Sequence, residues 1–138
     1  MPQLANPPDE KIKQILTEAK TIAVVGLSAK EDRASNMVAR YLQNHNYRII
    51  PVNPMAEEIL GEKSYASLTD IPEKVDIVDI FRKPEQVGPI IDEAVKLKAP
   101  VVWLQLGIRN DAEAQKVVDA GAVVIQDKCI KVEHAAHF

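Results

Sequence analysis

A short run of β-branched residues stops at a glycine, and a polar, basic loop follows before a helical pattern begins. The run covers residues 22–25 (IAVV), the glycine is Gly26, and the helical pattern starts at Ser35. An apolar run of this length that ends at glycine is typical of a buried strand in a parallel sheet. The start of the following helix offers free backbone N–H groups and the positive end of the helix dipole. With Lys30 and Arg33 in the loop, the stretch predicts an anion-binding site.

Strand-like and helix-like patterns alternate along the rest of the chain. Apolar runs predict strands over 21–26, 48–52, 75–81, 101–105 and 122–126. Apolar residues at helical spacing predict helices over 10–19, 35–45, 85–97, 111–120 and 130–136. Such alternation implies right-handed crossovers, parallel strands and helices on both faces. We therefore expect one α/β domain, a three-layer sandwich whose five-stranded sheet is mostly parallel.

Ligands of such sheets bind at the carboxyl ends of the strands, near the point where the strand order reverses. Four segments follow the expected strand ends at Gly26–Arg33, Asn53–Met55, Phe81–Pro84 and Leu106–Arg109. We expect these segments to converge in space and to form the functional site. After the third strand, Phe81 is suited to cover a flat ring, while Arg82 or Lys83 is suited to meet phosphate.

Several local features carry narrower expectations. Residues 1–8 are proline-rich and predict a flexible lead-in, and residues 55–74 are expected to be rich in loops. Pro51 has no N–H for a sheet, which suggests a strand end or a bulge. Asn110 with Glu113 resembles a capping box at the start of a helix. Trp103 lies inside a strand pattern and is expected in the core.

Composition excludes several classes of function. The net charge of −3 and the lack of a basic tract give no support for nucleic-acid binding. No apolar run approaches the roughly 18 residues that a membrane span requires. The single cysteine, Cys129, excludes an intramolecular disulfide and fits a reducing compartment, so we expect a cytoplasmic protein.

Other ligands are less well supported. The first loop, GLSAKEDRAS, matches neither a G-x-G-x-x-G fingerprint nor a Walker A loop. The second strand ends in Val52-Asn53-Pro54, without the acidic residue that pairs with a ribose in NAD-binding folds. A metal site built from Cys129, Glu133, His134 and His137 lacks an established ligand spacing. Cys129 paired with His134 as a nucleophile lacks a third group that orients the pair, so a buried Cys129 is expected.

At this point several segments resemble one family. TIAVVGLSAKEDRAS, RYLQNHNYRIIPVNP, EEILGEKSYASLTDIPEKVDIVDIFRKPE, VVWLQLGIRN and DKCIKVEH are similar to the small single-domain coenzyme A (CoA)-binding proteins. These proteins resemble the amino-terminal domain of the succinyl-CoA synthetase alpha subunit. The similarity covers about residues 10–138 in unbroken order. It implies a Rossmann-like fold that binds CoA or an acyl-CoA without catalysing a reaction.

The resemblance also implies a set of ligand-binding residues. They follow the four strand ends: Gly26, Leu27, Ser28, Lys30, Arg33, Ser35, Asn53, Pro54, Phe81, Arg82, Lys83, Leu106 and Gly107. The chain departs from the synthetase in having Met55 where that subunit carries a basic residue. It also lacks the second domain that holds the synthetase's phosphorylated histidine. A small enzyme that uses NAD(P) or an acyl-CoA, or a CoA-regulated protein-interaction module, remains an alternative. The sequence does not identify a protein partner.

Overall fold

The computed structural model describes residues 4–138, and its centre is one parallel sheet. Its five strands are β1 (Thr21–Val25), β2 (Arg48–Val52), β5 (Ile77–Ile80), β6 (Val101–Leu104) and β7 (Val123–Ile125). They lie in the order β2-β1-β5-β6-β7, and every neighbouring pair is parallel. The expected five-stranded sheet is confirmed.

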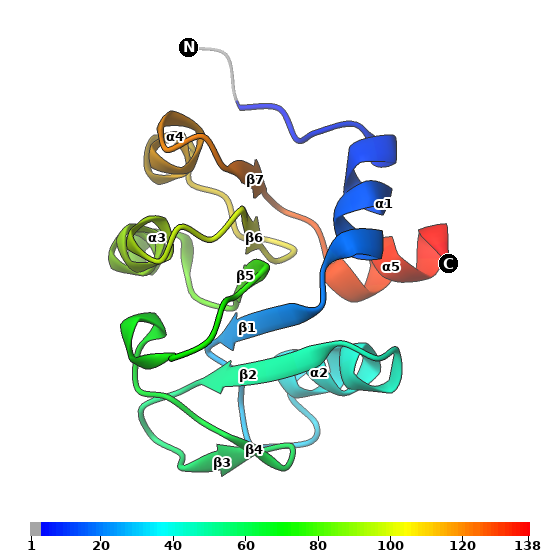
Figure 1. Cartoon of the computed structure of the whole chain (residues 1–138), viewed down its shortest axis with the longest axis vertical. Coiled ribbons are helices and arrows are strands. Elements are labelled where there is room, and N and C mark those ends of the chain that lie inside the picture. Colours follow the sequence, from blue (N-terminus) through cyan, green and yellow to red (C-terminus); the bar gives the residue numbers. More distant parts are fainter. Residues whose placement is uncertain (1–3) are drawn as a thin grey trace.

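Helices cover both faces of the sheet (Figure 1). One face carries α1 (Asp9–Glu18), α2 (Ala34–Asn44) and α5 (Ile130–His137). The other carries α3 (Val87–Lys96) and α4 (Asp111–Asp119), with 3₁₀ turns at Leu68–Asp70 and Pro84–Gln86. The result is the expected three-layer α/β sandwich with a Rossmann-like arrangement.

The apolar stripes seen in the sequence are the buried faces of these helices. Val38, Ala39 and Leu42 of α2 are at most 6% exposed, as their helical spacing predicts. Trp103 is completely buried, which confirms the expected core position. Its indole Nε1–H donates to the Lys128 carbonyl at 2.8 Å, so the single polar atom of the ring is paired. Asn110 caps α4 by accepting from the Glu113 N–H at 3.2 Å.

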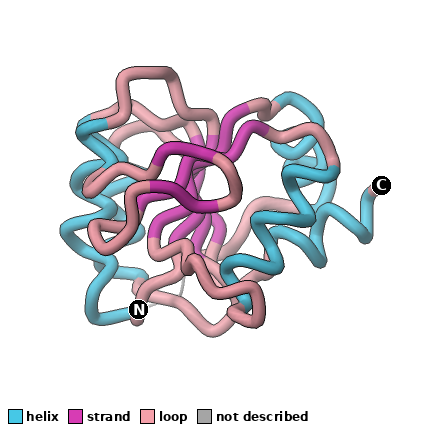
Figure 2. Tube along the Cα trace, turned by 90° about the horizontal axis from the view of Figure 1, so that it is seen from below, coloured by secondary structure: helices cyan, strands magenta, loops and turns pink. Residues whose placement is uncertain are grey.

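Residues 55–74 contain more structure than their composition suggests. A small antiparallel hairpin, β3 (Glu58–Ile59) and β4 (Glu62–Lys63), turns at Gly61 and extends beyond the β2 edge (Figures 1 and 2). Pro51 occupies neither a strand end nor a bulge, because it is a regular residue of β2 paired with Val24. It is tolerated there because β2 is an edge strand, where a missing N–H breaks no ladder.

Residues 4–8 have no regular secondary structure, yet they are tied to the domain. Asn6 exchanges two hydrogen bonds with the Gln126 backbone, donating from Nδ2 at 2.8 Å and accepting at Oδ1 at 2.7 Å. The Leu4 carbonyl accepts from Arg109 at 2.5 Å. This part of the expected flexible lead-in is therefore held by side chains, whereas residues 1–3 lie outside the described residues. Over residues 4–138, no helix is both long and apolar enough to cross a bilayer.

Candidate functional site

The carboxyl ends of the strands form one continuous edge of the sheet. Val25 at the end of β1 pairs with Val52 on one side and Ile80 on the other, and Ile80 pairs with Leu104. In the sheet β1 lies between β2 and β5, which are the next two strands of this sheet along the chain. The strand order therefore reverses at β1. The loops after β1 and β5 thus flank the switch point, where ligands of such folds bind.

Gly26 brings these two loops into contact. Its N–H donates to the Val52 carbonyl at 3.0 Å, and its φ is +84°. A Cβ at this position would lie 2.4 Å from the Phe81 carbonyl oxygen and 3.4 Å from Arg82 Nε. Only glycine accommodates both the left-handed backbone and this close approach. The first loop and the Phe81–Lys83 segment therefore converge, as the sequence predicts.

The first turn of α2 fixes the loop after β1. The Ser28 N–H donates to the Ser35 hydroxyl at 3.0 Å, and Asn36 Nδ2 donates to the Ser28 carbonyl at 2.8 Å. The Ser28 hydroxyl accepts in turn from the Lys30 N–H at 3.1 Å. Sequence reasoning missed Asn36, which is 1% exposed. The available signal was a polar residue on the apolar side of an amphipathic helix.

Three of the expected binding residues, Leu27, Ser35 and Asn53, have structural roles in the first loop. Leu27 is completely buried and packs in the core beneath α2, so its side chain is withdrawn from the surface. Its carbonyl accepts from Asn53 Nδ2 at 2.9 Å, while Asn53 Oδ1 accepts from the Met55 N–H at 2.8 Å. The side chain of Ser35 is likewise buried. Asn53 and Ser35 thus hold the first loop in place.

Four cations stand on the two converging loops. Lys30, Arg33, Arg82 and Lys83 are exposed, and over residues 4–138 none of them forms an ion pair. The helix α2 begins beside them without a capping side chain and without an acidic residue in its first turn. Free N–H groups and unpaired cations at one place make an environment suited to phosphate.

Other expected residues lie further along the same edge. Pro54 is exposed after β2, and Leu106 is 69% exposed after β6. The Gly107 N–H donates to Asp127 Oδ1 at 2.6 Å, and its φ of +85° explains the glycine. A pocket of about 150 Å³ opens between the β1 and β2 ends and α3, with Arg82 in its wall.

A buried acid lies beneath this edge. Asp79 of β5 is completely buried between Val24 and Trp103 of the neighbouring strands. Neither carboxylate oxygen has a hydrogen-bond partner within the described residues. Burial raises the pKa of Asp79 well above its ordinary value, because a charged carboxylate is poorly solvated there. The sequence marked this residue only as part of an apolar strand.

Cys129 and His134, the rival catalytic pair, differ in their surroundings. His134 is 6% exposed, and its Nδ1 lies 2.8 Å from the Tyr41 hydroxyl, a partner from α2. Burial, and to a lesser degree His45, lower the pKa of His134. Cys129 is the first residue before α5 and is half-buried, so the expectation of a fully buried thiol is wrong. It lies at the margin of the core, where it packs partly against the apolar cluster on the α1, α2 and α5 face.

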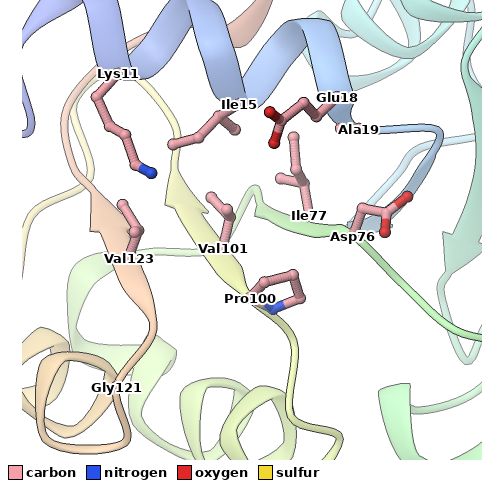
Figure 3. Close-up of a pocket in the computed structure, with 10 residues that line it drawn as sticks. All are labelled: Lys11, Ile15, Glu18, Ala19, Asp76, Ile77, Pro100, Val101, Gly121 and Val123. Atoms are coloured by element: carbon pink, nitrogen blue, oxygen red, sulfur yellow. The ribbon is translucent and has the colours of Figure 1, made fainter.

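A second hollow lies at the opposite edge of the sheet, where the strands begin (Figure 3). It has a volume of about 340 Å³ and an apolar floor that includes Ile77, Val101 and Val123. Lys11 and Glu18 of α1 stand over it with charges of opposite sign. Asp76 at its rim already accepts the Lys20 and Thr21 N–H groups. Its lining has one basic side chain, Lys11, and two acidic ones, Glu18 and Asp76, so this hollow suits an anion less well than the carboxyl edge does.

Comparison with known proteins identifies the relatives of this chain. A family model described as a CoA binding domain matches residues 20–135. The "Uncharacterized protein YneT" of Bacillus subtilis is 46% identical over 96% of this chain and 98% of its own length. A hypothetical protein from Pyrococcus horikoshii has a solved structure with a TM-score of 0.92 and 40% identity, covering 99% of this chain and 98% of that one.

Longer enzymes contain a similar domain. "Acetate--CoA ligase [ADP-forming] I" of Archaeoglobus fulgidus is 31% identical over 74% of this chain, but the match spans only 13% of the ligase. The family match covers most of the present sequence, and the small relatives match it from end to end. The chain belongs to the CoA-binding domain family.

Proposed function

We propose that this protein binds CoA or an acyl-CoA through its nucleotide phosphates at the carboxyl edge of the sheet. The observation that carries the proposal is a group of four exposed cations beside the uncapped start of α2, none of which forms an ion pair with any residue of the described range 4–138. They are Lys30, Arg33, Arg82 and Lys83. Membership of the CoA-binding domain family supports the choice of ligand.

The chemistry of CoA suits this edge. Its pyrophosphate and 3′-phosphate together carry several negative charges, which Arg and Lys bind by charge-assisted hydrogen bonds. The N–H groups at the start of α2 suit the pyrophosphate, since a helix start is a ready anion site. Arg33 and Lys83 stand on the two loops that Gly26 brings together, and we assign them to the 3′-phosphate.

The surroundings of the site favour CoA over NAD. The position after β2 is held by Asn53, whose amide is engaged with the first loop rather than free for a ribose. Met55 and Leu106 are 89% and 69% exposed at this edge. Apolar side chains of this kind suit the pantetheine arm, which has no counterpart in NAD. Residue 55 is neutral, so 3′-phosphate recognition falls to the cations of the two loops.

We further propose binding without catalysis. The similarity to the acetate–CoA ligase covers a small part of that enzyme, and its activity is not carried over with it. At the carboxyl edge the side chains of Asn53 and Ser35 are engaged with backbone groups of the first loop. The Nδ1 atom of His134 is engaged with the Tyr41 hydroxyl. A protein-interaction module regulated by bound CoA would use the same site.

The experiment is a calorimetric titration of the purified protein with CoA, dephospho-CoA, acetyl-CoA and NADH. We expect CoA and acetyl-CoA to bind, dephospho-CoA to bind more weakly, and NADH to give no heat. The double variant Arg33→Ala, Lys83→Ala should lose affinity for CoA by roughly 10-fold or more, since hydrogen bonds to charged groups contribute about 1.5–3 kcal/mol each. Its affinity for dephospho-CoA should change much less.

A matched double variant controls for net charge. Lys74→Ala with Lys96→Ala also removes two exposed cations, one before β5 and one at the end of α3, away from the carboxyl edge. It should bind CoA as the unmodified protein does. A preference for NADH would refute the proposal. Equal losses for CoA and dephospho-CoA in the first variant would refute the assignment of Arg33 and Lys83 to the 3′-phosphate.

A further inference from the structure

The first and last helices of the chain lie side by side (Figure 1). Asp9 is the first residue of α1, and Glu133 and His137 are one turn apart on α5. Residues four apart on a helix share one face, so the latter two side chains act together. One carboxylate oxygen of Asp9, one of Glu133 and one ring nitrogen of His137 all lie within 4.8 Å of one another.

This spacing is close to that of a metal centre. Around a tetrahedral ion with bonds of about 2.1 Å, neighbouring donor atoms are roughly 3.4 Å apart. The three donor atoms must therefore approach one another by at most about 1.4 Å. The side chain of Asp9 is exposed and free to rotate, whereas Glu133 and His137 are half-buried. Rotation of the exposed carboxylate supplies the adjustment that an ion requires.

The charge of the cluster also favours a cation. The cluster brings the carboxylates of Asp9 and Glu133 together. Within residues 4–138, one ion pair involves either of them, and it joins Glu133 to Lys128. Its Nζ–Oε1 distance of 3.9 Å is at the long end for such a pair. One ammonium offsets at most one of the two carboxylate charges. A divalent ion between the three donors would neutralise it.

We propose that Asp9, Glu133 and His137 bind a divalent first-row transition metal ion, with Zn²⁺ as the reference ion. An imidazole nitrogen beside two carboxylates suits Zn²⁺ and its neighbours, whereas Mg²⁺ and Ca²⁺ prefer oxygen donors alone. Three protein ligands leave a position for water. The bound ion joins α1 to α5 and so fixes the two ends of the described chain to each other.

The sequence alone argued against a metal site. The set considered there, Cys129, Glu133, His134 and His137, differs from the cluster proposed here. In the structure Cys129 is not part of the cluster, and His134 is engaged with Tyr41. The third donor is Asp9, which lies 124 positions before Glu133 and is brought to it only by folding.

The test is a titration of tag-free protein with ZnCl₂ by calorimetry, in the absence of CoA because its thiol and phosphates bind zinc. We expect one equivalent to bind and the melting temperature to rise, since an ion that binds the folded state stabilises it. His137→Ala and, as a second variant, Asp9→Asn should each weaken binding by about 10-fold or more. His45→Ala removes an imidazole outside the cluster and should bind Zn²⁺ normally.

Two further measurements distinguish this site from a thiolate site and from a site without preference for transition metals. Cys129→Ser should retain zinc binding, and loss of binding in that variant would overturn the proposal in favour of a thiolate ligand. MgCl₂ at the same concentration should leave the melting temperature unchanged, and an equal response to both ions would overturn the assignment to transition metals. Unaltered zinc binding by His137→Ala, or no zinc binding by the unmodified protein, would also overturn it.

Discussion

The contact between Gly26 and the Phe81 carbonyl allows a quantitative test of how the site is assembled. In Gly26→Ala the new Cβ would lie 2.4 Å from that oxygen, about 1 Å closer than an ordinary contact. The Phe81 backbone directly follows β5 and must move. Overpacking of this kind costs about 1–3 kcal/mol. The left-handed φ of +84° adds roughly 1–2 kcal/mol for an alanine.

Gly121→Ala is the matched control. Gly121 has a nearly identical φ of +83°, but a Cβ built there meets nothing within 4 Å. The loss of stability in Gly121→Ala therefore comes from the left-handed backbone alone. Both variants reduce the conformational entropy of the unfolded chain by the same amount. The difference between the two variants isolates the steric term, about 1–3 kcal/mol, or roughly 3–10 °C in melting temperature for a domain of this size.

The assay is urea unfolding followed by circular dichroism, with melting temperatures measured in parallel. We expect Gly26→Ala to be the less stable variant and to bind CoA more weakly, because the loops after β1 and β5 are displaced. Gly121→Ala should bind CoA like the unmodified protein, since Gly121 lies at the opposite edge. Equal destabilisation of the two variants would refute the reasoning that close approach, rather than φ alone, requires glycine at position 26.

Two further predictions concern the groups beneath the site. The pKa of Asp79 is raised in the folded protein, so this state binds more protons and stability falls as pH rises above about 4, the ordinary carboxyl pKa. Asp79→Asn should remove this loss, and its stability advantage in urea unfolding should grow with pH; parallel curves would contradict this. Asn53→Ala leaves the Leu27 carbonyl and the Met55 N–H without their hydrogen-bond partner. The free energy of unfolding should fall by about 1–2 kcal/mol in the same assay. No measurable change would show that other contacts hold the first loop.

Local pattern was sufficient to predict most elements of this fold. The helix α2 is predicted by the helical spacing of its apolar residues, and the strand β1 by a run of adjacent apolar residues. Both patterns lie within a few neighbouring positions of the sequence. The β3–β4 hairpin was missed because two-residue strands contain no period to detect. Pro51 was misread because its acceptability depends on β2 being an edge strand, which is a property of the whole sheet.

The site was predictable in outline because the carboxyl ends of parallel strands share one edge. The roles of individual residues were less accessible. Leu27 and Lys30 are three positions apart in one loop, yet one is completely buried and the other is exposed. Asn36 and Asp79 are both buried, and the burial of a polar residue could not be predicted from the sequence. The assignment of individual residues to CoA phosphates stays a prediction until the titrations are made.

The way the two outer strands are covered bears on how this domain behaves at high concentration. An open strand at the margin of a sheet is a template for pairing with another molecule. Beyond β2, Tyr65 donates its N–H to the Pro51 carbonyl and accepts from the Asn53 N–H, so the chain occupies that margin itself. At the end of β7 the amide of Asn6 binds both the N–H and the carbonyl of Gln126, as a neighbouring peptide group would. Both margins are thereby guarded against edge-to-edge aggregation, one by a backbone bridge and the other by a single side chain.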